Sequence, residues 1–156
     1  MADKSLSAIR EFLAQHRIAM IGASRSDKDF SAKLFTDLRR AGYDVVPVNP
    51  NATEIGGVQC FPRVQDIAPP VDAALIMLPS AHAAPAIRDC SDAGIRRVWL
   101  YGFKGPSKID PAALQTCREL GLSAIAGYCP YMFLPNGAWF HRAHGWVTRL
   151  VGAYPT

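Results

Sequence analysis

Several features that mark other classes of protein are missing from this chain of 156 residues. Its four cysteines form no Cys-x-x-Cys pair and fit no zinc framework, so reduced thiols are the expected state. No segment reaches the ~18 uninterrupted apolar residues of a membrane span. Residues 1–16 carry charges where a signal peptide has its apolar centre. The sequence therefore predicts a cytoplasmic protein without a membrane span.

Positive charge is in slight excess but is not concentrated anywhere in the chain. The formal net charge is +4 and the isoelectric point is about 9.0, which favours anionic ligands. Basic residues cluster no further than the pairs Arg39-Arg40 and Arg96-Arg97. No nucleic-acid partner is predicted on this basis. The length suits one domain, residues 1–156.

Short apolar runs alternate with segments of helical spacing along the chain. Continuous apolar runs are typical of strands buried on both faces, as in parallel sheets. The expected strands are residues 17–23, 45–48, 73–78, 97–101 and 123–126, and the expected helices are residues 5–14, 31–41, 80–93 and 111–120, with one helical turn at 64–67 and a plain loop around Gly56-Gly57. The alternation predicts an α/β fold: a Rossmann-like, doubly wound parallel sheet of about five strands with helices on both faces.

Ligands of doubly wound sheets bind beyond the carboxyl ends of the strands, so the residues that follow each strand are candidates. After the first strand, Gly22 allows a tight turn, and the small residues Ala23 and Ser24 let backbone N–H groups approach a ligand. The next helix offers its N-terminal N–H groups to an anion, while Arg25 and Lys33 add positive charge. This loop is interpreted as a phosphate cradle, and a plain strand-to-helix turn is the alternative.

The same loop lacks the second and third glycines of the Gly-x-Gly-x-x-Gly fingerprint. The second strand also ends without a carboxylate, in Val48-Asn49-Pro50. NAD-binding domains place Asp or Glu at that point to hold the ribose hydroxyls, so NAD is disfavoured. Asn49 can still bond a ribose or an adenine, and a nearby Lys or Arg can pair with an additional phosphate. A simple turn is the other interpretation of Asn49-Pro50.

Four segments, IAMIGAS, GYDVVPVNP, EIGGVQCFPRVQDI and GYCP, resemble in this order the small stand-alone CoA-binding proteins, which are related to the N-terminal CoA-binding domain of the succinyl-CoA synthetase α subunit. The resemblance covers residues 18–130 and implies a Rossmann-like fold that binds CoA or an acyl-CoA. The cofactor-binding residues expected from the strand ends and the resemblance are Gly22, Ala23, Ser24, Arg25, Lys33, Val48, Asn49, Pro50, Leu78, Pro79 and Gly102. The family's Trp-x-Gln-x-Gly pattern at the fourth strand has Tyr101 in place of the amide, which leaves the contacts at that edge open.

No convincing set of catalytic side chains is visible, so non-catalytic binding of CoA or an acyl-CoA, as a regulatory or carrier module, is the predicted function. The alternative is an NAD(P)-like nucleotide-binding enzyme or a CoA-linked enzyme subunit that uses His82 or Cys129. His82 follows the third strand and is otherwise a surface histidine at a helix start. Cys129 follows the fifth strand and is otherwise a small turn residue, although a thiol there could form a mixed disulfide with CoA. No metal site is predicted, because His141 and His144 lack a third ligand.

The C-terminal segment 131–156 extends beyond the core, residues 17–130. Within it, residues 136–152 place two tryptophans at helical spacing, which predicts an amphipathic helix. Packing against the domain is the preferred role of this helix. A homodimer interface is second, because tryptophan is enriched at such contacts, and a membrane-surface helix is third.

Overall fold

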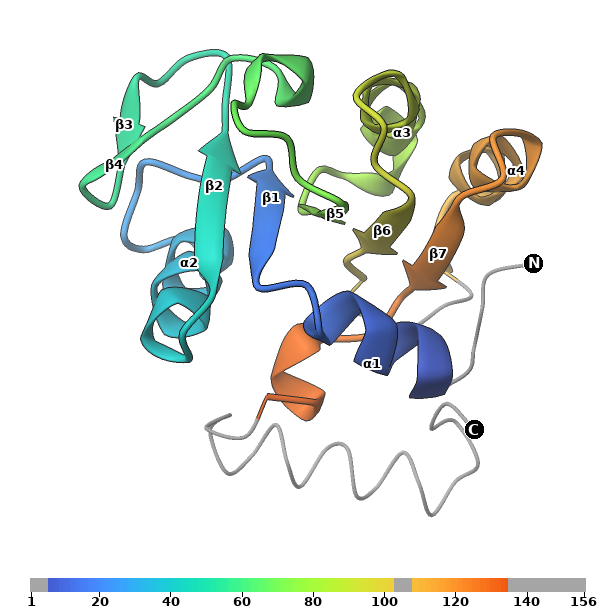
Figure 1. Ribbon diagram of the computed structural model, residues 1–156, viewed down its shortest axis with the longest axis horizontal. Coiled ribbons are helices and arrows are strands. Elements are labelled where there is room, and N and C mark those ends of the chain that lie inside the picture. The colour runs from blue at the N-terminus through green and yellow to red at the C-terminus, as the bar shows by residue number, and fades with distance from the viewer. Residues whose placement is uncertain (1–5, 103–107, 135–156) are drawn as a thin grey trace.

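The computed structural model describes residues 6–102 and 108–134, and it confirms the predicted α/β fold (Figure 1). One parallel sheet has the strand order β2-β1-β5-β6-β7. Its strands are β1 (Arg17–Ile21), β2 (Asp44–Val48), β5 (Ala73–Ile76), β6 (Arg97–Leu100) and β7 (Ser123–Ala126). The α-helices are α1 (Leu6–Leu13), α2 (Phe30–Arg40), α3 (Ala83–Asp92) and α4 (Pro111–Glu119).

Both faces of the sheet are covered by helices. Alternate side chains of a strand point to opposite faces, and in β1 both sets are buried: Ile18 and Met20 pack with α1 and α2, whereas Ala19 and Ile21 belong to the cluster of α3 and α4. The ribbon shows the same two helical layers (Figure 1). The doubly wound, Rossmann-like architecture is therefore confirmed, and it explains why the strands read as unbroken apolar runs.

The strand order places a switch point between β1 and β5. From β1 the chain crosses to β2 on one side, returns past β1, and adds β5, β6 and β7 on the other side. Connections that leave neighbouring strands in opposite directions open a crevice beyond their carboxyl ends, and this is where doubly wound sheets bind ligands.

Several element boundaries differ from the sequence-based expectation. Strand β1 ends at Ile21, two residues early, because Gly22 turns the chain with a φ of 86°. Strand β5 ends at Ile76 instead of residue 78. The helix expected from Ser80 or the residues after it begins with a 3-10 helix, η2 (Ser80–His82), and continues as α3 from Ala83.

The expected plain loop around Gly56-Gly57 is a small hairpin. Strands β3 (Glu54–Ile55) and β4 (Val58–Gln59) pair antiparallel, and both glycines adopt positive φ. A Gly-Gly pair between two short strands is a hairpin signal that the sequence interpretation missed. The chain then returns beside β2, where Phe61 N donates to Pro47 O at 3.0 Å. The 3-10 helix η1 (Val64–Asp66) follows and confirms the predicted helical turn.

The predictions for the C-terminal segment concern mainly residues that the structure does not describe. The amphipathic helix at 136–152 and the homodimer contact assigned to it lie outside the described residues and stay predictions, as does the division into a core and an extension. A last short 3-10 helix, η4 (Pro130–Met132), follows β7. No helix within 6–102 or 108–134 is long and apolar enough to cross a membrane.

Candidate functional site

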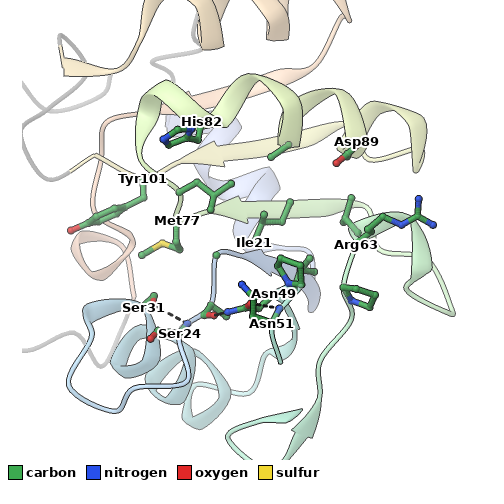
Figure 2. Close-up of a pocket in the computed structure, with 18 of the residues that line it drawn as sticks. Ile21, Ser24, Ser31, Asn49, Asn51, Arg63, Met77, His82, Asp89 and Tyr101 are labelled. Atoms are coloured by element: carbon green, nitrogen blue, oxygen red, sulfur yellow. Dashed lines mark hydrogen bonds between the residues drawn. The ribbon is translucent and has the colours of Figure 1, made fainter. Parts of the chain in front are cut away.

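A cleft of about 850 Å³ lies beyond the carboxyl ends of β1, β2, β5 and β6 (Figure 2). Its volume is within the range of about 300–1,000 Å³ that is usual for small-molecule sites. The cleft is lined by seven of the residues singled out from the sequence: Gly22, Ala23, Ser24, Val48, Asn49, Pro50 and Leu78. The switch point thus carries a hollow that residues from several strand ends share.

The other predicted contacts are placed differently. Arg25 lines an adjoining cavity of about 490 Å³, which shares Pro50 and Asn51 with the cleft. Lys33 is exposed on α2 and lines neither cavity. The described lining also leaves out Pro79 and Gly102. Arg25 is therefore the one predicted cation that borders the hollow.

The loop after β1 is folded around Ser24. Gly22 N donates to Val48 O at 3.1 Å, which ties the start of the loop to β2. Ser24 N donates to Ser31 Oγ at 3.2 Å, and Ser24 Oγ donates to the Asp29 carboxylate. The loop is thus closed onto the start of α2.

These contacts leave the N-terminus of α2 open to the cleft. Asp29 occupies the N-cap position, but its side chain makes no capping hydrogen bond, since its carboxylate accepts from Ser24. The N–H groups of Ala32 and Lys33 reach Asp29 O, whereas those of Phe30 and Ser31 have no acceptor within the described part of the chain. Free N–H groups at the positive end of a helix form a site for a phosphate.

The Asn49 side chain is held by hydrogen bonds to the loop after β1 and to the turn after β2. Its Nδ2 donates to Ala23 O at 2.9 Å, and its Oδ1 accepts from Asn51 N at 2.8 Å. The side-chain amide therefore joins the end of β2 to the loop after β1. For a ribose or an adenine, Asn49 then has the second hydrogen of Nδ2 and the second lone pair of Oδ1 left to offer.

The sequence analysis did not predict several residues that line the cleft, although the positions of some of them after a strand could have indicated it. Met77 and Tyr101 directly follow β5 and β6, so the strand-end rule should have included them. Arg63 and Asp89 offered no such signal. Arg63 is brought to the rim by the β3–β4 hairpin, and Asp89 projects from the body of α3, where it accepts from Gln65 Nε2 at 2.8 Å.

Arg63 and Tyr101 differ sharply in environment. The Arg63 guanidinium is two-thirds exposed and pairs with Asp66 at 3.0 Å, which raises the pKa of Arg63 further. Tyr101 is half-buried and stacks on Phe30, with ring centroids 5.1 Å apart and an interplanar angle of 24°. Burial raises the pKa of Tyr101 to about 12, so its hydroxyl remains protonated at neutral pH.

Neither candidate catalytic residue has the partners that catalysis needs. His82 lines the cleft but is exposed, and no carboxylate or hydroxyl of the described chain hydrogen-bonds to its imidazole. Cys129 does not line the cleft, and burial raises its pKa. A nucleophile requires an adjacent base or a lowered pKa, and the described residues supply neither here.

Low thiol reactivity is a testable consequence of this burial. Burial raises the pKa of all four cysteines, to about 12 for Cys90 and about 11 for Cys117. A raised pKa keeps a thiol protonated to a higher pH, so the reactive thiolate stays scarce at pH 7.5. We expect no CoA adduct by intact mass after incubation with CoA disulfide, while urea-unfolded protein reacts. An adduct on the native protein that Cys129→Ser removes would contradict this.

The sequence profile of a family described as a CoA binding domain matches residues 16–135. This chain belongs to that CoA binding domain family. The match covers β1 to η4 and includes every residue that lines the cleft. The resemblance seen in the sequence is thereby confirmed.

Curated relatives and solved structures agree with this membership. The α subunit of an ADP-forming acetate–CoA ligase II from Pyrococcus furiosus is 32% identical over 125 residues, which cover 76% of this chain and 27% of the subunit. An ADP-forming acetate–CoA ligase II from Archaeoglobus fulgidus is 30% identical over 96 residues, 60% of this chain and 14% of the ligase. A hypothetical protein from Pyrococcus horikoshii has a TM-score of 0.71 and 27% identity, covering 80% of this chain and 85% of that one. The chain thus spans a small part of the ligases but most of the horikoshii protein.

Proposed function

We propose that this chain binds CoA or an acyl-CoA in the cleft at the switch point and does not itself transform it. The observation that carries the proposal is the open N-terminus of α2, which faces the cleft of a CoA binding domain. CoA carries a diphosphate, and helix N-termini that follow the first strand of such sheets bind diphosphates. A role as a regulatory or carrier module fits binding without chemistry.

Each part of CoA is assigned to the loop whose residues suit its chemistry. The diphosphate lies against Ser24 and the N–H groups of Phe30 and Ser31. The adenosine lies toward Asn49 and Pro50, because the residues after the second strand contact the nucleotide ribose in this fold. Arg25, in the adjoining cavity, is then placed to pair with the 3′-phosphate.

The predicted CoA contacts differ in whether they line the cleft. Gly22, Ala23, Val48 and Leu78 are proposed as contacts because they line the cleft. Lys33, Pro79 and Gly102 remain predictions that the lining does not support.

The absence of catalysis is also part of the proposal. His82 lacks a partner within the described chain, and the cysteines are held as thiols. The acetate–CoA ligases are enzymes by name, but this chain matches only 27% of the P. furiosus subunit and 14% of the A. fulgidus protein. We therefore do not assign their activity to it.

Calorimetric titration with CoA, acetyl-CoA, NAD and NADP tests the proposed function. We expect CoA to bind with a Kd on the order of 1 µM, about 8 kcal/mol, and NAD to bind more weakly, since no carboxylate follows β2. Ser24→Glu places a negative charge in the cradle and should weaken CoA binding by at least about tenfold, about 1.4 kcal/mol. The matched control Ser7→Glu adds the same charge at an exposed position of α1 and should leave the affinity unchanged. A wild-type protein that does not bind CoA would overturn the proposal.

A further inference from the structure

The residues that follow the parallel strands form a row across the edge of the sheet. The register pairs Val48 with Ile21, Ile21 with Ile76, and Ile76 with Leu100. The next residue of each strand therefore comes in the order Asn49, Gly22, Met77, Tyr101. Neighbouring strands lie about 4.8 Å apart, so Tyr101 is about 10 Å from the Gly22 column and on the side away from Asn49.

This row gives a direction to a bound CoA. The diphosphate site, at the open end of α2, belongs to the Gly22 column. The nucleotide occupies the Asn49 side, as in other doubly wound sheets. The pantetheine arm leaves the diphosphate on the opposite side, passes Met77 and ends at Tyr101.

The two ends of the cleft also differ in chemistry (Figure 2). Arg63 and Asp89 lie together at one end and offer polar partners for a base. Pro62, next to Arg63 in the chain, and Pro85, four residues before Asp89 on α3, also line the cleft and offer apolar surface. His82 and Tyr101 lie at the other end. His82 and Asp89 are seven residues apart along η2 and α3, which corresponds to about 10 Å in a helix.

The surface at the Tyr101 end is mainly aromatic and apolar, apart from the exposed imidazole of His82. Phe30 stacks on Tyr101, and Met77 lies beside it because β5 and β6 are paired neighbours. No lysine or arginine among the described residues lines the cleft at this end. The nearest acidic group along the chain is Asp29, which precedes Phe30 and also lines the cleft.

We propose that the Phe30–Tyr101 pair, here called the aromatic wall, takes the thiol end of CoA and selects an acyl group without charge. This inference rests on the proposed binding of CoA and adds the orientation of the ligand and the class of acyl group. The protonated Tyr101 hydroxyl, for which no hydrogen bond is recorded among the described residues, donates to the thioester carbonyl. An acyl chain with its own carboxylate meets no lysine or arginine of the described residues at this end of the cleft, so it is disfavoured.

The aromatic wall offers a ligand two kinds of contact. The phenol ring of Tyr101 covers the ring of Phe30. A tyrosine offers both a flat apolar face and a hydroxyl donor, which suits a thioester better than a free phosphate.

Adenosine 3′,5′-bisphosphate, which is CoA without the pantetheine arm and the phosphate that joins it, separates the two ends of the cleft in a calorimetric titration. We expect Tyr101→Ala to weaken CoA and acetyl-CoA at least about fivefold and to leave the bisphosphate unchanged. Arg63→Gln, an exposed substitution at the other end, should weaken all three ligands. Tyr101→Phe keeps the stack and should weaken acetyl-CoA more than CoA. Circular dichroism of each variant verifies that it is folded.

Each result distinguishes this inference from the proposed function itself. If the wild-type protein does not bind CoA, the proposed function fails. If CoA binds but Tyr101→Ala weakens the bisphosphate equally, the adenine occupies the aromatic wall and the inference is wrong. It is also wrong if Tyr101→Ala leaves CoA unaffected, or if succinyl-CoA, which carries a carboxylate, binds as tightly as acetyl-CoA.

Discussion

Replacing Gly22 with alanine is expected to cost stability and to remove most of the affinity for CoA. Gly22 has a φ of 86°, a conformation that costs an L-residue about 1–2 kcal/mol. A Cβ at this position would also lie 2.9 Å from Leu78 Cδ2 and 3.3 Å from Leu78 N. The Leu78 side chain has to move, and Leu78 lines the cleft, so the steric conflict reaches the binding site. We expect the affinity for CoA to fall at least about tenfold, or 1.4 kcal/mol.

Gly94→Ala is the matched control for this substitution. Gly94 has a similar φ of 81°, but no atom lies within 4 Å of the Cβ that alanine would add. Both variants carry the backbone strain, whereas only Gly22→Ala carries the conflict with Leu78. Urea denaturation should show a larger loss of stability for Gly22→Ala, and calorimetry should show unchanged CoA affinity for Gly94→Ala. Equal losses of stability together with intact CoA binding in both variants would refute the steric argument.

Trp99→Ala is expected to have the largest effect on stability. Trp99 is fully buried in β6, and its ring packs edge-on against Phe12 with centroids 5.3 Å apart. Its Nε1 donates to Tyr128 O at 3.0 Å, which connects β6 to the segment that follows β7. Truncation of a buried tryptophan to alanine costs about 3–5 kcal/mol, a large part of the ~5–15 kcal/mol by which domains are stable.

Trp99→Phe separates the two contributions of this side chain. It keeps an aromatic ring in the core but leaves the Tyr128 carbonyl without its donor. A buried acceptor that loses its partner costs about 1–3 kcal/mol. Urea denaturation should therefore rank the variants as wild type, Trp99→Phe and Trp99→Ala in order of decreasing stability. If Trp99→Phe is as unstable as Trp99→Ala, the hydrogen bond matters more than the packing.

The main elements of the fold could be predicted because their signals are local. Unbroken apolar runs such as residues 98–100 are typical of strands covered on both faces, and the structure buries them on both. The Asp110-Pro111 pair marks the start of α4, where Asp110 Oδ1 accepts from Ala112 N at 2.9 Å. Boundaries such as Ile21 were less predictable, since the apolar pattern continues through Ala23 after the strand hydrogen bonds have ended.

The candidate site was predicted only where it follows directly from a strand end. Gly22, Ala23 and Ser24 line the cleft because any residue after β1 in such a sheet faces the switch point. Arg63 could not be predicted from the sequence, because its position depends on the β3–β4 hairpin and on the return of the chain beside β2. Lys33 was predicted as a contact because its positive charge is close in sequence to the loop after β1. The structure places it on an exposed part of α2, away from the lining of the cleft.

The sequence by itself determined the class of fold and the family, because apolar periodicity and the motif around Gly22 are properties of consecutive residues. Only the tertiary structure decided which side chains share the cleft. The pairing of β5 with β6 places Met77 beside Tyr101, and the stacking of Tyr101 on Phe30 joins residues 71 positions apart in the chain, from 30 to 101. Strand pairing and side-chain packing are set by the burial of apolar surface from the whole domain, so no local stretch specifies them.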